Sequence, residues 1–132
     1  MTSTSSPRPP AGKIICHAMW APDGRALAGF YATALGTTVT ETYPDEHGDD
    51  TAFGFYADGT MYLFYTSASF TPPNWPQDDL PFHMDLAFDD AATAEEQLLA
   101  MGATKPAHQL GGEHWTVLLD PSGQPLCIHT SH

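Results

Sequence analysis

The pattern of apolar and polar positions over residues 82–88 predicts a β-strand, and the pattern of a helix follows directly. Apolar residues alternate with His83 and Asp85, so these two polar side chains are expected on one face of the strand. Asp90 then offers an N-cap, and apolar residues continue at helical spacing until Gly102, which ends the helix. The stretch therefore predicts a strand, a helix and a helix stop.

The first half of the chain has the same order of elements. Residues 13–20 predict a strand, Asp23 an N-cap, residues 26–35 a helix, and Gly36 its end. Further strands are expected over 37–43, 51–57 and 61–66 in the first half and over 115–119 and 125–130 in the second, with tight turns at 58–59 and 120–123. Corresponding landmarks recur at an offset of about 66 residues, which indicates two copies of a βαβββ unit.

The length suits one α+β domain built from these two copies. We place module one at 13–66, a linker at 67–81 and module two at 82–131 within a single domain at 13–132. A tail at 1–12, rich in Ser, Thr and Pro, is expected to be disordered because it holds too little apolar surface to fold.

Charge and cysteine content narrow the possible partners and the compartment. Sixteen acidic against four basic residues give a formal charge of −12, which disfavours nucleic acid and membrane surfaces as partners. The sequence has no apolar run of about 18 residues and no apolar signal region near its start. Because its two cysteines form no C-x-x-C pair, we expect a reduced, cytoplasmic protein.

Four segments resemble the glyoxalase-like and bleomycin-resistance-like branch of the vicinal oxygen chelate superfamily. They are FYATALG (30–36), HMDLAFDD (83–90), LLAMGA (98–103) and WTVLLDPSGQPLCI (115–128). The resemblance implies two tandem βαβββ modules in a curled mixed sheet that encloses a U-shaped cleft, and a homodimer. It leaves the activity open, because the fold hosts isomerases, transferases, oxygenases and drug-binding proteins.

The resemblance also implies where a metal ion would be held. In metal-using members the ligands are a His on the first strand and a Glu on the last strand of each module, positions that hold Cys16, Leu63, His83 and Cys127 here. Since neither Glu is present, no cofactor is expected. The alternative is a divalent metal site, zinc or similar, formed by Cys16, His83 and Cys127, although both cysteines could equally be small buried apolar residues.

Polar and aromatic side chains supply the remaining candidates for a site. His83 and Asp85 form either an acid/base pair or a satisfied polar pair at a strand start, and His129 shares the face of Cys127. The aromatic residues either pack in the core or stack on a ligand. Those expected to stack on it are Trp20, Phe55, Tyr65, Trp75 and Trp115.

These features predict a protein that binds a small organic molecule without an obligatory metal ion, for instance to sequester an antibiotic or metabolite. The alternative is a lyase, isomerase or other enzyme that tailors natural products. Such an enzyme would act either with a metal held by Cys16, His83 and Cys127 or without one through His83 and Asp85.

Overall fold

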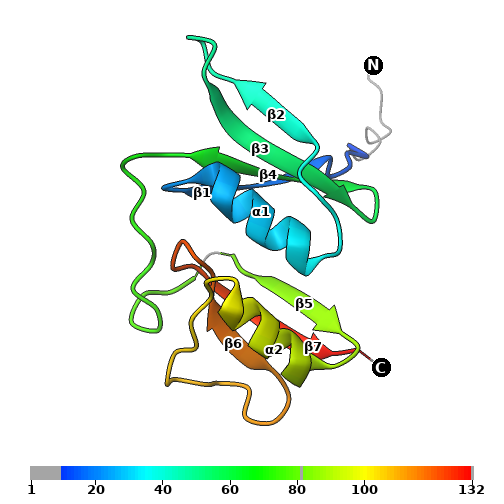
Figure 1. The fold of residues 1–132 in the computed structure, drawn as a ribbon, viewed down its shortest axis with the longest axis vertical. Coiled ribbons are helices and arrows are strands. Elements are labelled where there is room, and N and C mark those ends of the chain that lie inside the picture. Colours follow the sequence, from blue (N-terminus) through cyan, green and yellow to red (C-terminus); the bar gives the residue numbers. More distant parts are fainter. Residues whose placement is uncertain (1–9, 81, 132) are drawn as a thin grey trace, which may run out of the picture.

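Two units follow each other along the chain, and each begins with a strand and a helix and continues with further strands (Figure 1). The computed structural model describes residues 10–80 and 82–131. The first unit contains β1 (Cys16–Ala21), α1 (Gly24–Ala34), β2 (Glu41–Pro44), β3 (Asp50–Ala57) and β4 (Thr60–Thr66), and the second contains β5 (Met84–Phe88), α2 (Ala91–Ala100), β6 (Thr116–Leu119) and β7 (Pro125–Thr130). The longer of these two helices has 11 residues, and no helix in the described ranges could cross a bilayer.

Each unit forms its own sheet. The first sheet has the strand order β1-β4-β3-β2 and the second the order β5-β7-β6, and in each the first strand runs parallel to the last. Both helices lie on the same side of the molecule, each across its own sheet (Figure 1). The α+β fold of two repeated modules is therefore confirmed, with two separate sheets. Among the described residues the second module has three strands, one fewer than the predicted βαβββ unit, because beside β6 only an isolated bridge forms, between Thr104 and Leu119.

Side chains near the ends of the elements explain where they begin and end. The N–H of Ala26 donates to Asp23 Oδ1, and Asp90 accepts from the main chain at the start of α2, so both predicted N-caps are confirmed. Asp58 and Gly59 both have positive φ, 50° and 80°, as the predicted hairpin turn requires. Several strands are shorter than expected: the strand predicted over 37–43 begins only at Glu41.

Some predictions fall on residues outside the described ranges. The disordered tail predicted over 1–12 lies mostly there, as does the last residue of the linker predicted over 67–81. The described part of that linker, residues 67–80, contains turns and no strand or helix.

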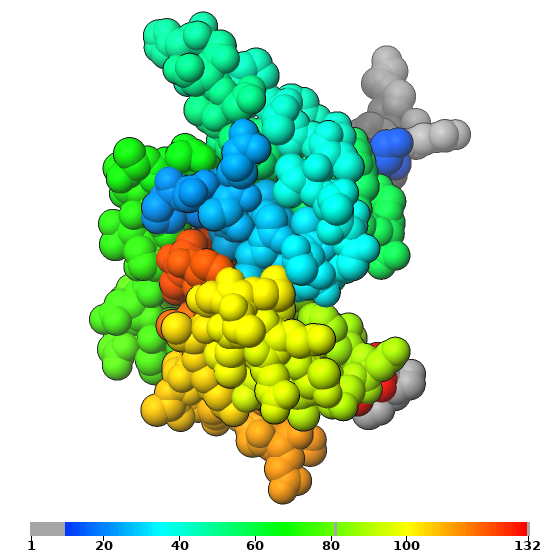
Figure 2. Space-filling view, in the orientation of Figure 1, coloured from blue at the N-terminus to red at the C-terminus, as the bar shows by residue number. Residues whose placement is uncertain are grey.

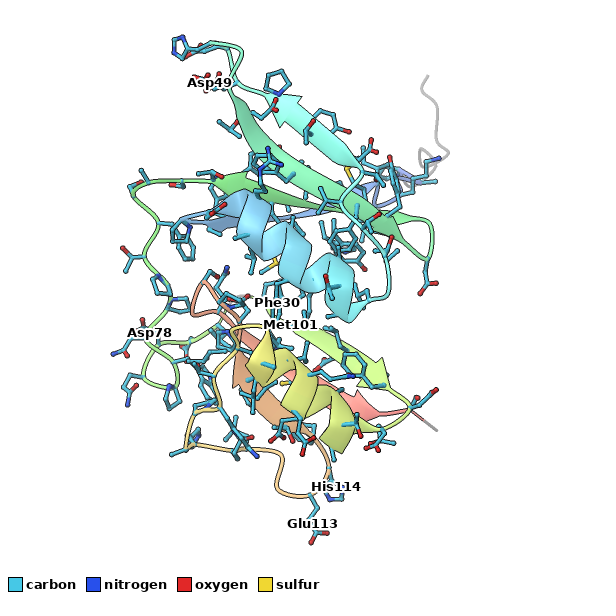
Figure 3. The ribbon with its side chains drawn as sticks, in the orientation of Figure 1. Phe30, Asp49, Asp78, Met101, Glu113 and His114 are labelled. Atoms are coloured by element: carbon cyan, nitrogen blue, oxygen red, sulfur yellow. The ribbon has the colours of Figure 1, made fainter. Side chains whose placement is uncertain are left out.

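One apolar core extends through both modules. It contains residues of α1 and of α2, and Phe30 and Met101 lie close together between the two helices (Figure 3). The buried Tyr31 hydroxyl also donates a hydrogen bond of 2.7 Å to Asp120 Oδ2 in the turn between β6 and β7. That turn, orange in Figure 2, lies against the blue residues of the first module. Burial, and then the Asp120 carboxylate, raise the pKa of Tyr31 well above its usual value.

The outer edge of β6 has no full strand beside it, yet its main-chain groups are paired. Thr104 forms a two-way main-chain bridge with Leu119. Two residues along β6, the Gln109 side-chain amide takes the place of a strand: its Nε2 donates to Val117 O at 2.9 Å and its Oε1 accepts from Val117 N at 2.9 Å. The Gln109 amide also donates to Pro106 O, so one side chain holds the loop before β6 against the sheet.

We expect Gln109→Ala to lower the free energy of unfolding by about 2 kcal/mol, because it leaves both main-chain groups of Val117 without their partners. Urea denaturation measures this loss, and amide hydrogen exchange should show faster exchange at Val117 than in the wild-type protein. Gln97→Ala on the exposed side of α2 is the control and should change neither quantity. Unchanged exchange at Val117 would contradict the role given to the Gln109 amide.

Candidate functional site

A pocket of about 330 Å³ lies on the face of the second sheet opposite α2. Alternation along the strands produces this face: Asp85 pairs with Cys127 and Ala87 with His129, whereas Leu86 points into the core. Two loops complete the walls. The lining residues are Trp75, Leu80, His83, Asp85, Leu110, Trp115, Val117, Pro125, Cys127 and His129.

A single carboxylate connects the two histidines of the pocket. Asp85 Oδ1 lies 3.2 Å from His129 Nε2 and 3.6 Å from His83 Nε2. A carboxylate oxygen only accepts hydrogen bonds, so the nearer nitrogen, Nε2 of His129, carries the proton of this bond. In the neutral ring, Nδ1 of His129 is then the nitrogen that can accept a hydrogen bond.

Cys127 is a buried residue of the pocket lining and pairs with Asp85 across the sheet. Burial, and then the negative charge of Asp85, raise the pKa of the Cys127 thiol to about 11. At neutral pH the sulfur therefore carries its proton and is a poor nucleophile. One ligand atom each of His83, Asp85 and Cys127 lies within 4.8 Å of the others, and these three residues could hold a metal ion.

Cys16, which the sequence placed in the alternative metal site, is not in this group. It lies at the start of β1, paired with Met61 in the other sheet, and its sulfur is 3.5 Å from the carbonyl oxygen of His17. The correspondence between the modules puts Cys16 and His83 at equivalent positions, but the modules form separate sheets. Among the described residues, Asp85 joins His83 and Cys127 instead of Cys16.

Two of the five predicted aromatic residues line the pocket. The ring of Trp115 stacks on His129 with centroids 6.1 Å apart, and Trp75 meets His108 edge to face at 5.4 Å. Trp115 packs against Gly111 so closely that a Cβ there would collide with the indole and with its carbonyl oxygen. The pocket wall therefore depends on a glycine at this position.

The other three aromatic residues lie in the first module. Phe55 is 0 % exposed and stacks on Phe64 under α1, so it packs in the core and does not face a ligand. Trp20 and Tyr65 stack on each other on the uncovered face of the first sheet, with centroids 4.9 Å apart. Trp20 lines a neighbouring cavity, whereas Tyr65 lines neither that cavity nor the pocket.

Four lining residues were not identified from the sequence. Val117 and Pro125 share a sheet face with Cys127 by register, which strand alternation would have indicated once the pairing was known. Leu80 and Leu110 come from irregular loops, where no periodicity marks them. The lining residues include neither Lys nor Arg.

The comparisons with known proteins agree with this fold. A family model described as a glyoxalase-like domain matches residues 14–129. No functionally curated protein matches the chain by sequence. Among solved structures, a glyoxalase family protein from Enterococcus faecalis superposes with a TM-score of 0.65 at 21 % identity, covering 90 % of this chain and 98 % of that one.

Two further solved structures share the fold at low identity. A glyoxalase/bleomycin resistance protein/dioxygenase family enzyme from Burkholderia phytofirmans gives a TM-score of 0.59 at 18 % identity, over 87 % of this chain and 95 % of that one. A fosfomycin resistance protein from Listeria monocytogenes, complexed with Mn(II), gives a TM-score of 0.65 at 11 % identity, over 92 % of this chain and 93 % of that one. At these identities the likeness shows the fold alone.

Proposed function

The chain belongs to the glyoxalase-like domain family, and we propose that it binds a small, uncharged organic molecule in the pocket of its second module. Sequestration of an antibiotic or a metabolite would be the biological purpose. One observation carries the proposal: two tryptophans and several aliphatic side chains line one pocket together with a cluster of polar groups. Mostly apolar walls with a few convergent polar groups are typical of small-molecule sites.

The charges around the pocket indicate what kind of molecule fits. Asp85 is the acidic residue among the lining side chains, and none of the described lining residues can supply a lysine or arginine cation. The whole chain carries a formal charge of −12. An anionic ligand would therefore be repelled, whereas an uncharged aromatic molecule gains from burial and from stacking.

Binding of this kind needs no metal ion. The positions where the family resemblance implies glutamate hold Leu63 and Cys127. His83, Asp85 and His129 can instead form hydrogen bonds with the polar group of a ligand directly. Trp115 and Trp75 would contact its apolar part.

We expect Trp115→Ala to weaken the binding of uncharged aromatic compounds by about tenfold or more, since stacking and apolar contact are lost. Hits from a ligand-observed NMR screen of the wild-type protein supply the compounds. The control is Tyr56→Ala, which removes an exposed aromatic ring outside the pocket. Trp75→Ala is a second test at the other tryptophan of the pocket, in case Trp115→Ala disturbs folding.

The same screen, repeated with a chelator, tests whether a metal ion is needed. The proposal predicts unchanged affinities after metal removal. If no compound depends on either tryptophan, or if all binding is lost with chelator and restored by zinc, the proposal is wrong.

A metal-dependent enzyme is the second candidate, favoured by the closeness of His83, Asp85 and Cys127. Imidazole nitrogen, carboxylate oxygen and sulfur together suit Zn²⁺ better than Mn²⁺. These three residues would hold the ion, which would act as a Lewis acid on a substrate oxygen. Stoichiometric zinc in protein purified without chelator, lost in His83→Ala, would support this candidate.

A further inference from the structure

A second cavity, of about 400 Å³, adjoins the pocket described above. The two share three lining residues, Leu80, His83 and Pro125. Because the same side chains form walls of both, the cavities meet along this row of residues. A molecule bound in the pocket would reach the second cavity by passing over this row of three residues.

The walls of the second cavity come largely from the other module and from the linker. Trp20 on β1 contributes an indole that is 50 % exposed, and Phe70 contributes a second ring from the linker. Trp20 is held in place from two sides: its ring stacks on Tyr65, and its main-chain carbonyl accepts a hydrogen bond of 3.0 Å from Gln124 Nε2 of the second module. An indole that is both fixed and exposed is suited to stacking on a ligand.

Polar side chains lie at the border between the two cavities. The His83 side chain is 42 % exposed, and its Nε2 lies 3.6 Å from Asp85 Oδ1. On one side of His83 lie Trp75 and Trp115, and on the other lie Trp20 and Phe70. The described residues lining the second cavity, like those of the pocket, include neither Lys nor Arg.

We propose that the pocket and the second cavity form one bipartite site for an uncharged, elongated molecule. The molecule would carry two ring-sized apolar groups joined by a hydrogen-bonding linkage of the amide type. Each cavity lies near the lower limit of the volumes that hold drug-sized ligands, which suits one ring system in each. This inference rests on the proposed function and adds the chemical class of the ligand.

An amide linkage matches the groups at the junction. Its N–H can donate to the Asp85 carboxylate, and its carbonyl oxygen can accept from an imidazole N–H of His83. A free carboxylate or phosphate in the same place would lie beside Asp85 with no basic side chain among the described lining residues to balance its charge.

Two commercial compounds test the inference: benzanilide, which has two phenyl rings around an amide, and N-methylbenzamide, which has one. Their dissociation constants are measured by ligand-observed NMR titration of the wild-type protein and four variants, Trp115→Ala, Trp20→Ala, Phe70→Ala and Tyr56→Ala. We expect benzanilide to bind about tenfold more tightly than N-methylbenzamide. Trp115→Ala should weaken the binding of both compounds. Trp20→Ala should weaken the binding of benzanilide by about tenfold and leave the affinity for N-methylbenzamide unchanged.

Tyr56→Ala is the matched control, because Tyr56 is also 50 % exposed and lies on the first sheet, outside both cavities. Equal affinity for the two compounds, or benzanilide binding that is insensitive to Trp20→Ala and to Phe70→Ala, would overturn the bipartite site. The proposed function would still stand if both compounds depended on Trp115. If neither compound bound, or if Trp115→Ala changed neither, both proposals would fail.

Discussion

Replacement of Asp120 by alanine is expected to lower the free energy of unfolding by about 3 kcal/mol. The Asp120 carboxylate is 3 % exposed and accepts hydrogen bonds from the Tyr31 hydroxyl and from main-chain and side-chain groups of its own turn. Removing it leaves the Tyr31 hydroxyl buried without its partner and loosens the turn between β6 and β7. Urea denaturation followed by far-ultraviolet circular dichroism measures the loss.

Two further variants distinguish what the hydrogen bond between the modules contributes to stability from what the turn bonds of Asp120 contribute. Tyr31→Phe removes only the hydroxyl and leaves the turn bonds of Asp120 in place, so we expect a smaller loss of about 1.5 kcal/mol. Asp49→Ala, at an exposed position in the turn between β2 and β3 (Figure 3), should change the stability by less than about 0.5 kcal/mol. A protein as stable with Asp120→Ala as with Asp49→Ala would contradict the structural role of this carboxylate.

Alkylation of Cys127 by iodoacetamide is expected to be about 100-fold slower at pH 8 than that of an ordinary cysteine. The thiolate is the reactive form, and burial together with Asp85 raises the pKa of Cys127 from 9.0 to about 11. Since the raised pKa favours the protonated thiol, the rate should increase with pH until about 11. Mass spectrometry of the Cys16→Ser variant, in which Cys127 is the remaining thiol, measures the rate.

The control for this prediction is Asp85→Asn, which removes the negative charge beside the sulfur while keeping the shape of the side chain. In the Cys16→Ser background, the protein with Asp85→Asn should react faster at pH 8 than the protein that keeps Asp85, because the charge of Asp85 contributes to the raised pKa. A wild-type rate equal to that of an ordinary cysteine would show that Cys127 is neither buried nor shifted as described.

Much of the fold could be predicted because its signals are local. Asp23 and Asp90 cap their helices through bonds to residues two or three positions away, and Asp58 with Gly59 forms the hairpin turn on its own. The internal repeat in the sequence then indicated the order of strands and helices along the chain. The separation into two sheets depends on contacts between distant segments, which no local pattern encodes.

The site was predicted only in part for the same reason. Alternation put His83 and Asp85 on one face, but their meeting with Cys127 and His129 follows from the parallel pairing of β5 with β7. The face on which Phe55 lies depends on the register of β3 with β4, and the strand looks apolar on both sides.

The pairing of Gln109 with Val117 has a consequence beyond the stability of one loop. An exposed strand edge with unpaired N–H and C=O groups is a template on which another chain can add a strand, and proteins that leave one open tend to aggregate. Along β6, Thr104 covers Leu119 and the Gln109 amide covers Val117, so a second molecule meets a row of groups already bonded. The short second sheet is thereby protected from edge-to-edge self-association at the place where the first module has a further strand.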